Sequence, residues 1–545
     1  MGLFKIIASI IGGLGAFLVG CKLLSDNLEK IANKGIKKLF NKASNNRMLG
    51  VGIGFVSTGI VQSSGLTTVI VVGLVNAGVM TLFQAASVIM GANIGTTVTA
   101  FIAMLGTIDV ASIFLIFTAV GIFTSMISKK EGVKTIGLIF AGLGLIFVGL
   151  GLMKDGFYDL QSFGSVGDAI NNFLIGLKNP FLLLLIGIIF TTLTQSSSVI
   201  TAILVTMASN DLLVGGGGNA VLFIILGTNI GSTTTALLSS IGTGANAKRA
   251  SLIHLLFNTF GAVIFFIVFL VWPTFMDDVI ASWITEPGLQ IAVFHTFFNV
   301  LCTLIFIPFV NVFVAISKKL IKDKGTETTS YLDKRILNVP SLAIESASKE
   351  MMRILDISMN TLDKALDGFY ASDKSTIESI EKTVDEINSA GQSVTDYLVK
   401  ISATEHIDHQ SEQIVSSMHY AIGDILRVGE LSHNVTKYTK RRIKDDLHFS
   451  DKVIVELKAF NDLLHTLHDT AKEVFMTKNN ALLDKVDQLE DKIDSTRRRL
   501  VNEHIARLNK GECKAESNSV FINLVNNMER IGDHIETLAH GVIIK

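Results

Sequence analysis

The sequence has few of the features that indicate a disulfide-bonded protein, an ATP-driven pump, an enzyme or a nucleic-acid-binding protein. Its three cysteines, Cys21, Cys302 and Cys513, are far apart and give no disulfide or metal spacing. It has no GxxxxGK[ST] loop, which disfavours primary pumping, and no nucleophile–base arrangement that would indicate catalysis. Its net charge of −1 gives no support for a nucleic-acid partner.

Charged residues are also scarce, at 17% of the chain, and they are unevenly distributed. Residues 1–325 carry a net charge of +7 and the remainder a net charge of −8. A soluble protein of this length needs more polar surface than the first part offers. The first apolar segment is expected to be a retained spanning helix rather than a signal peptide. Segments long enough to span a bilayer are 3–24, 109–128, 135–153, 250–272 and 289–316.

Four further apolar segments are interrupted by Gln, Ser, Asn, Thr and Gly. Helices that break at membrane depth are tolerated only where the break is buried in protein or lines a wet cavity. We therefore expect broken or re-entrant helices in these segments, which are 48–77, 81–106, 180–208 and 219–241.

The interrupted segments are two copies of one pattern. VQSSGLTT and GANIGTTVTA in the first copy match TQSSSVIT and GTNIGSTTTA in the second. Upstream, GLGAFLVGCKLLSD, ending at Asp26, matches GLGLIFVGLGLMKD, ending at Asp155. The offset drifts only from 129 to 136 residues, as a duplication with small insertions would give. We place repeat one at about 5–106 and repeat two at about 135–241.

Equivalent loops of the two repeats differ in charge. The segment 25–47 has six basic and two acidic residues, whereas 153–180 has two basic and three acidic residues. Basic loops stay in the cytoplasm, so the first loop is expected inside and its twin outside. This arrangement is an inverted repeat, which is common among secondary transporters. The basic clusters at 129–134, 248–249 and 318–324 are expected to be cytoplasmic too.

The remainder of the chain has a helical pattern. After a polar linker at 326–340, apolar residues recur three and four positions apart, with charges between them. The predicted fold is therefore all-α: a polytopic membrane domain at 1–325, then a soluble cytoplasmic bundle at 341–545. The six helices of the bundle are expected near 341–370, 374–402, 408–440, 449–478, 481–509 and 517–541.

The paired QSS segments form the first candidate binding site. A helix broken at Ser-Ser exposes backbone N–H groups at its new N-terminus, where anions bind. Serine hydroxyls and Gln amides suit a tetrahedral oxyanion, and their oxygens also suit Na⁺. The alternative is that Ser and Thr only join packed helices, but the duplication favours a site. The candidate oxyanion ligands are Gln62, Ser63, Ser64, Gln195, Ser196, Ser197 and Ser198.

The GxNIG[TS]T segments form a second candidate group. Their glycines permit bends and close helix approach, and their Asn amides could cap a broken helix or bind a cation. No Asp or Glu lies within 48–106 or 180–208, so a bound dianion needs cations to offset its dehydration. The candidate sodium-binding or site-supporting residues are Thr67, Thr68, Asn93, Thr96, Thr97, Asn229, Ser232 and Thr233.

Two smaller echoes remain. HLLFN at 254–258 and HTFFN at 295–299 each place His and Asn on one helical face, where we expect polar contacts between packed helices. In the soluble part, MERIGDHIE resembles ILRVGELSH. Glu529 and Asp533, with Glu430 of the other copy, could bind a divalent metal. The alternative is that these carboxylates form ion pairs within their helices.

These motifs resemble two known families. VQSSGLTT with GANIGTTVTA, and TQSSSVIT with GTNIGSTTTA, are similar to the duplicated core of the type II sodium–phosphate cotransporters over about 1–315. The MERIGDH segment and the six-helix pattern resemble a PhoU-like domain over about 340–545. The resemblance implies phosphate at the QSS residues, with the NIG residues beside it. Gly65 departs from the family, where a third Ser is usual.

The sequence therefore predicts a secondary transporter of a bacterial cytoplasmic membrane that imports inorganic phosphate with Na⁺ as coupling ion. Transport requires no other cofactor. The PhoU resemblance implies a regulatory role, metal binding through Glu529 and Asp533, and room for regulatory protein partners; a homodimer is also compatible. The alternatives are another oxyanion, proton coupling, or a membrane-bound phosphate sensor that signals through the soluble domain.

Overall fold

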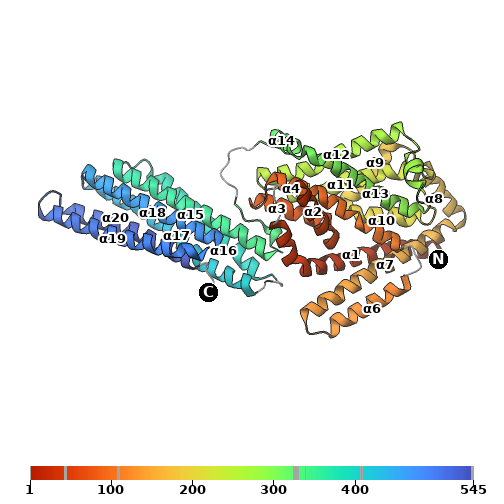
Figure 1. Cartoon of the computed structure of the whole chain (residues 1–545), viewed down its shortest axis with the longest axis horizontal. Coiled ribbons are helices and arrows are strands. Elements are labelled where there is room, and N and C mark those ends of the chain that lie inside the picture. Colours follow the sequence, from red (N-terminus) through yellow and green to blue (C-terminus); the bar gives the residue numbers. More distant parts are fainter. Residues whose placement is uncertain are drawn as a thin grey trace. The chain divides into compact units, whose positions relative to one another are not determined.

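The computed structural model describes residues 2–41, 46–106, 111–322, 330–337, 339–404, 407 and 409–541. Within these ranges the regular structure is entirely helical, which confirms the predicted all-α class (Figure 1). The chain forms two compact units, Met1–Thr329 and Ser330–Lys545. The predicted basic loop at 25–47, the span at 109–128 and the linker at 326–340 each fall partly outside the described ranges.

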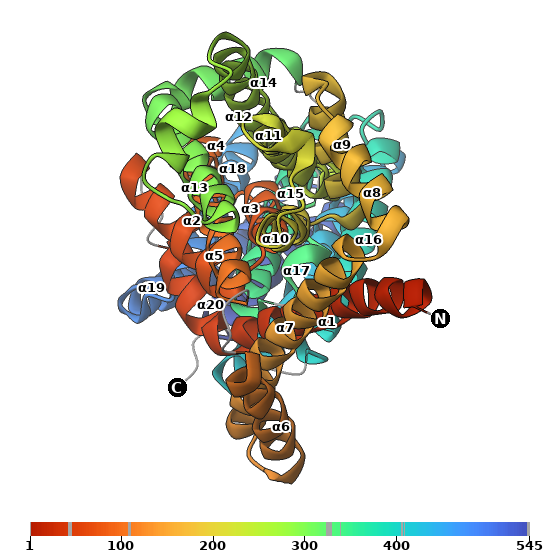
Figure 2. The same cartoon turned by 90° about the vertical axis from the view of Figure 1, so that its right-hand side faces the viewer.

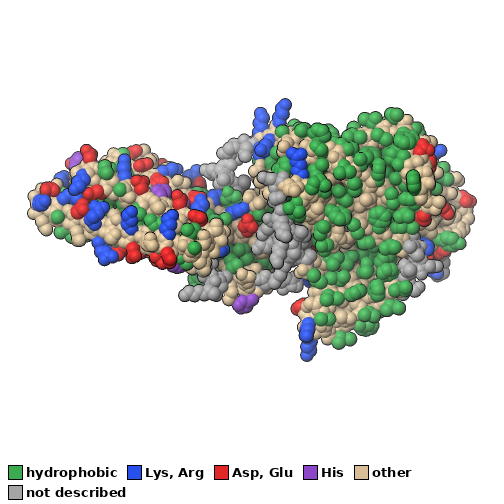
Figure 3. All heavy atoms as spheres, viewed as in Figure 1, with side chains coloured by type: hydrophobic (Ala, Val, Ile, Leu, Met, Phe, Trp, Pro, Cys, Tyr) green, Lys and Arg blue, Asp and Glu red, His purple; other side chains and the backbone are tan. Residues whose placement is uncertain are grey.

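The first unit has the character of a multi-pass membrane domain. Six of its described helices are long and apolar enough to cross a bilayer. Hydrophobic side chains cover much of its visible face, whereas charged side chains cover the second unit (Figure 3). Its helices are α1 (Gly2–Asn41), α2 (Arg47–Val61), α3 (Ser64–Asn76), α4 (Leu82–Thr96), α5 (Val98–Leu105), α6 (Ala111–Ile127), α7 (Glu131–Gln161), α8 (Gly164–Gly176), α9 (Pro180–Thr194), α10 (Ser197–Ala208), α11 (Ala220–Ser239), α12 (Ala245–Val271), α13 (Pro287–Phe306) and α14 (Val310–Leu320).

The contact between α1 and α7 relates the two repeats by a two-fold axis. A Cβ on Gly13 would lie 2.7 Å from the Gly149 oxygen, and one on Gly20 would lie 2.8 Å from the Gly142 oxygen. The helices therefore cross closely and run antiparallel. In the duplicated sequence, Gly142 is the twin of Gly13 and Gly149 is the twin of Gly20. Gly13 therefore contacts the twin of Gly20, and Gly20 contacts the twin of Gly13, as a two-fold axis requires. For spanning helices this axis lies in the membrane plane, which is the plan of an inverted repeat.

In the first repeat, α2 and α3 form a re-entrant hairpin. Gly50 of α2 faces Ser87 of α4, and Gly95 of α4 faces Thr58 of α2, so α2 and α4 run parallel. The connecting α3 must therefore return in the opposite direction, and the chain reverses at Gln62 and Ser63. Helix α2 has 15 residues. It is thus about 22 Å long, too short to cross a hydrocarbon core of about 30 Å.

The second repeat copies this hairpin with α9 and α10. Gly187 of α9 faces Ile224 of α11, and Gly231 of α11 faces Thr191 of α9, so these two helices also run parallel. Each contact joins the twins of residues in contact between α2 and α4. Before the hairpin, α8 meets α9 at 109°. The predicted breaks at the two QSS segments are confirmed.

The predicted interruption at the NIG segments is wrong for the second repeat and slight in the first. Helix α11 runs unbroken through Asn229, and α4 continues into α5 after a single turn residue, Thr97. The glycines serve close packing instead: a Cβ on Gly91 would lie 2.0 Å from a backbone oxygen of α2, and one on Gly227 would lie 2.1 Å from a backbone oxygen of α9.

The remaining elements complete both units. Short turns of 3₁₀-helix occur at Val214–Gly216, Ile307–Phe309, Lys334–Ile336 and Asn480–Leu482, and a π-helical segment at Met276–Ala281. The second unit has the six predicted helices around a core of Leu, Ile, Val, Met and Phe side chains. They are α15 (Pro340–Ala371), α16 (Ile377–Ser402), α17 (His409–Lys444), α18 (Asp451–Thr477), α19 (Leu483–Asn509) and α20 (Glu516–Gly541).

Candidate anion-binding site

The two hairpin tips have the same backbone geometry. Gln62 has φ 57° and ψ 22°, and Gln195 has φ 53° and ψ 24°, both in the left-handed region. The next residues, Ser63 and Ser196, are extended, with φ −142° and −148°. A left-handed residue other than Gly costs about 1–2 kcal/mol. The same unfavourable turn is therefore built twice, immediately before the helices α3 and α10.

These turns leave open hydrogen-bond donors at the N-termini of α3 and α10. The Ser63 hydroxyl accepts a hydrogen bond from the Leu66 N–H at 3.2 Å. In the described part of the chain the Ser64 and Gly65 N–H groups have no acceptor. Ser196 makes no cap bond, so the first turn of α10 is more open still. Because the helix dipole is positive at this end, both turns favour an anion.

The serines of the first turns have hydroxyls available for a ligand. Within the described residues no hydrogen bond is formed by the hydroxyl of Ser64, Ser197 or Ser198, although Ser197 is only 5% exposed. Threonine side chains one turn later hydrogen-bond to the carbonyls of these serines. The Thr68 hydroxyl donates to the Ser64 carbonyl at 2.8 Å, and the Thr201 hydroxyl donates to the Ser197 carbonyl at 2.9 Å. The backbone at Ser64 and Ser197 is therefore fixed by these bonds, while the hydroxyls of Ser64, Ser197 and Ser198 remain available to a ligand.

The two glutamines at the tips differ in their surroundings. The Gln62 amide nitrogen donates to the Gly59 carbonyl, and its oxygen accepts from the Thr99 hydroxyl at 2.9 Å. Gln195 is exposed and its side chain has no hydrogen bond among the described residues. The first tip is thus closed by its own neighbours and the second is open. The sequence motifs are nearly identical and did not indicate Thr99 as a partner of Gln62.

The inner arms of the hairpins are enclosed by helices of both repeats. Helix α3 packs against α11 of the second repeat, and α10 packs against α5 of the first. In Figure 2 both arms lie centrally among the helices of the membrane unit. A Cβ on Gly65 would lie 3.4 Å from the Thr235 side chain of α11. Residues from the two repeats therefore meet beside the first tip.

The predicted site-supporting hydroxyls donate within their own helices. Thr67 donates to Ser63, Thr96 to Ala92, Thr97 to Ile94, Ser232 to Asn229 and Thr233 to Ile230. A hydroxyl that gives its proton to a carbonyl presents only lone pairs to a further ligand. Such oxygens suit a cation better than an anion.

The two NIG asparagines are used in different ways. The Asn93 amide donates to Asn258 at 3.1 Å, and its oxygen lies 3.2 Å from His254 Nε2, all three residues being buried. These contacts join α4 to α12 and confirm the expected polar contacts between packed helices for His254 and Asn258, whereas the Asn299 amide donates to the His295 carbonyl of its own helix. The Asn229 amide instead donates to the Ile225 carbonyl of its own helix at 2.9 Å. Asn93 therefore connects two packed helices, a role that the sequence motif did not indicate.

In the second unit, two of the three predicted metal ligands form ion pairs. Glu430 pairs with Arg427 three residues earlier, and Glu529 lies 3.3 Å from Arg497 of α19. Burial, together with the neighbouring Asp533 carboxylate, raises the pKa of Glu529. The ion-pair alternative thus describes Glu430, whereas Glu529 and Asp533 lie in a carboxylate-rich seam between α19 and α20.

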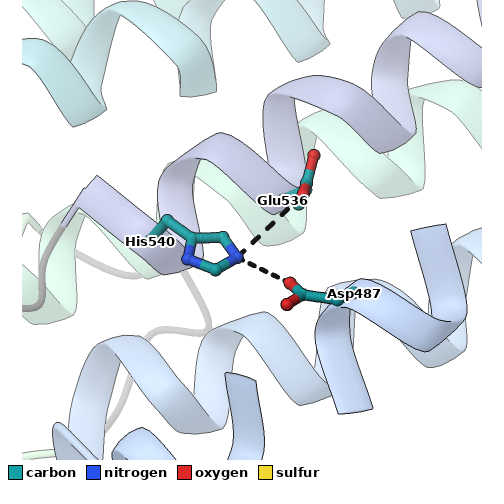
Figure 4. A group of neighbouring side chains, drawn as sticks. All are labelled: Asp487, Glu536 and His540. Carbon is teal, nitrogen blue, oxygen red and sulfur yellow. Dashed lines mark hydrogen bonds and ion pairs between the residues drawn. The ribbon is translucent and has the colours of Figure 1, made fainter. Parts of the chain in front are cut away.

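One group in the described residues has the geometry of a metal site. His540 Nε2 lies 2.7 Å from Asp487 and 4.0 Å from Glu536, and one ligand atom of each lies within 4.8 Å of the others (Figure 4). Burial raises the pKa of Glu490 to about 7, and the charge of Glu536 adds to this. One His with carboxylates suits a divalent transition metal. Sequence reasoning missed this group because Asp487 comes from another helix.

The fold and the two hairpin tips define a class of protein. Inverted repeats that carry broken helices with open N–H groups near the centre of a membrane domain are the plan of secondary transporters. The family models agree: the Na⁺/Pi-cotransporter model matches residues 16–155 and 162–274, and the PhoU domain model matches 351–439 and 457–542. The chain belongs to the Na⁺/Pi-cotransporter family and carries a PhoU domain.

Three curated proteins are similar to this chain over different parts of its length. YjbB of Salmonella typhimurium, named as a candidate inorganic phosphate export protein, is 21% identical and covers 98% of this chain and 97% of its own. The uncharacterised YqeW of Bacillus subtilis is 30% identical over 56% of this chain and 96% of its own. The human sodium-dependent phosphate transport protein 2B is 37% identical over 92 residues, 16% of this chain and 13% of its own.

Proposed function

We propose that this protein is a Na⁺-coupled transporter of inorganic phosphate that binds its substrate at the two hairpin tips. The observation that carries the proposal is the pair of helix N-termini at which the first N–H groups of α3 and the hydroxyls of Ser64, Ser197 and Ser198 have no partners in the described chain. Phosphate oxygens accept such donors. The proposed ligands are Gln62, Ser63, Ser64, Gln195, Ser196, Ser197 and Ser198.

Sodium coupling follows from the charge of the substrate. No carboxylate lies on either hairpin or on α4 and α11, and no basic side chain apart from Arg47 at the start of α2. A dianion that leaves water there needs mobile positive charge. Hydroxyl oxygens that donate to carbonyls can bind Na⁺ beside it. The proposed sodium-binding or supporting residues are Thr67, Thr68, Asn93, Thr96, Thr97, Asn229, Ser232 and Thr233, with Asn93 in a supporting role.

Uptake into proteoliposomes tests the function directly. Radiolabelled phosphate should accumulate when Na⁺ is high outside, and equal Na⁺ on both sides or replacement by K⁺ should abolish accumulation. Accumulation driven by a pH gradient without Na⁺ would indicate proton coupling instead. Competition by sulfate at concentrations similar to those of phosphate would indicate a broader oxyanion transporter. No uptake under any gradient would reject transport and favour the sensor alternative.

The direction of transport has two candidates. An inward Na⁺ gradient drives a symporter toward import, which is the direction we propose. Export is the second candidate, because the YjbB relatives that match almost the whole chain are named for it. Loading vesicles with labelled phosphate and reversing the Na⁺ gradient separates the two: a symporter reverses with the gradient, whereas an exporter releases phosphate independently of it.

We further propose that the PhoU domain is cytoplasmic and binds a divalent metal at Asp487, Glu536 and His540. Isothermal calorimetry with Mn²⁺ or Zn²⁺ on the full chain should give binding that Glu536→Gln removes. The matched control is Glu529→Gln, one of the positions that the sequence indicated on the same helix. If Glu529→Gln removes binding and Glu536→Gln does not, the ligands lie at the Glu529–Asp533 pair instead.

A further inference from the structure

Gly65 and Thr235 face each other across the boundary between the two repeats. Gly65 is the fourth residue of the first QSSG turn, where the second repeat has Ser198. A Cβ at Gly65 would lie 3.4 Å from Thr235 Cγ2 and 3.8 Å from its hydroxyl oxygen. This is ordinary van der Waals contact, so the space in front of Gly65 is bounded by Thr235 of the other repeat.

The Thr235 hydroxyl is a polar atom without a partner. Its oxygen is buried and forms no hydrogen bond among the described residues. Its twin in the first repeat, Thr99, donates to Gln62 at 2.9 Å. A serine at position 65 could form a hydrogen bond with the Thr235 hydroxyl. Because Gly65 has no side chain, the Thr235 hydroxyl remains available to another partner. Buried hydroxyls that stay unpaired are unfavourable, so a ligand is the natural partner.

We propose that Thr235 supplies to the first hairpin tip the hydroxyl that Gly65 lacks, and so completes an oxyanion site with residues from both repeats. This inference rests on the proposed function and assigns a substrate contact within it. The ligand is the oxyanion rather than Na⁺, because the Ser64 and Gly65 N–H groups lie at the positive end of the α3 dipole, where a cation is disfavoured.

The test is a set of single substitutions in the full-length protein, each reconstituted for Na⁺-driven phosphate uptake. Thr235→Val should raise KM for phosphate about tenfold, the loss expected for one hydrogen bond to a charged ligand. The Na⁺ concentration for half-maximal rate should stay within about twofold, because the hydroxyl contacts no cation. Thr235→Ser should behave like the wild type.

A double variant provides the decisive comparison. Adding Gly65→Ser to Thr235→Val returns a hydroxyl to the same space from the other side and should restore KM. The matched control is Thr228→Val on the same helix, whose hydroxyl donates only to the Ile225 carbonyl at 2.8 Å. It should leave KM unchanged, and equal elution in detergent should show that all variants fold.

The outcomes separate this inference from the proposed function. If the wild type neither takes up nor binds phosphate, the proposed function fails and the inference fails with it. If the wild type transports phosphate and Thr235→Val has the same KM, only the inference is overturned. A Thr235→Val variant that changes the Na⁺ dependence and not the phosphate KM would also overturn it, because the hydroxyl would then serve the cation.

Discussion

Ser197 and Ser64 allow the candidate site to be tested one hydroxyl at a time. Each stands at the first helical position after a break and has no hydrogen bond from its hydroxyl in the described chain. Ser197→Ala and Ser64→Ala should each weaken phosphate binding by about 1–3 kcal/mol, since each leaves a ligand oxygen unpaired. Titration of the purified protein with labelled phosphate in Na⁺ measures this change.

The control for these variants is Ser239→Ala at the far end of α11. Its hydroxyl donates to the Ala236 carbonyl of its own helix at 2.8 Å. Its loss should leave phosphate affinity within experimental error. Unchanged affinity in both Ser64→Ala and Ser197→Ala would contradict the proposed site.

Sequence reasoning identified the serines of the tips but not their unequal surroundings. The motifs at Gln62 and Gln195 are nearly the same, so the sequence predicts the same role for both. The structure closes Gln62 with Thr99 and leaves Gln195 exposed. Which glutamine is closed depends on the neighbouring helices and not on the motif. Asn93 was equally unpredictable, because its partners on α12 are more than 160 residues away.

At the scale of elements, the glycines of α2 decide how closely it approaches α4. A Cβ at Gly54 would lie 1.9 Å from the Val88 oxygen, and because this oxygen belongs to the backbone of α4 it cannot move aside as a side chain could. Gly54→Ala should therefore destabilise the membrane unit by about 1–3 kcal/mol through overpacking. Thermal unfolding in detergent measures the loss.

Gly52 provides the matched control on the same helix. A Cβ at Gly52 meets nothing within 4 Å. Gly52→Ala should be neutral or slightly stabilising, because alanine is the better helix former. Equal melting temperatures for the two variants would show that α2 can shift away from α4 and that the close approach is not required.

The same glycines explain where sequence reasoning about the helices succeeded and failed. Both QSS turns break the chain, as predicted. The NIG segments have the same mixture of Gly, Asn and Thr, but α11 continues through them. Hydroxyls and amides in a helix can donate to a carbonyl three or four residues earlier, and glycines four apart can form a flat contact face. Local composition alone therefore does not distinguish a helix break from a packing face.

At the scale of the whole molecule, the PhoU domain should respond to pH through a pair between α15 and α18. The hydrogen bond from His465 to Asp363, at 2.8 Å, raises the pKa of the imidazole. Burial alone would raise the pKa of Asp363, but hydrogen bonds from His465 and Asn461 lower it. The pair is most stabilising when His465 is protonated and Asp363 is ionised.

The sign of the pH effect follows from these shifts. The His465 contribution is complete below its unfolded pKa of about 6.5 and is lost as pH rises through the raised folded value. The Asp363 contribution is lost only in strong acid. Thermal unfolding of residues 330–545, which form a compact unit of their own, should show His465→Asn less stable than the wild type near pH 6. A difference that persists at pH 9 would contradict the assignment.

The division into two units predicts what truncation should do. All the proposed phosphate and sodium ligands lie before Thr329, and the proposed metal ligands lie after it. A chain ending at Thr329 should therefore retain Na⁺-driven phosphate uptake and lose metal binding. Loss of uptake in a well-folded truncated protein would show that the second unit is required for transport itself.

The reciprocal crossing of α1 and α7 has a consequence for the working cycle. Because the two repeats are equivalent across this crossing, the proposed transport cycle leads us to expect that each repeat adopts in turn the conformation that the other holds. In this structure the Gln62 side chain is hydrogen-bonded to Gly59 and Thr99, whereas Gln195 is exposed. Under the proposed function, exchange of these two arrangements is expected to change the side of the membrane from which phosphate reaches the tips. We therefore expect the second end state of the cycle to resemble this structure with the roles of the two repeats interchanged.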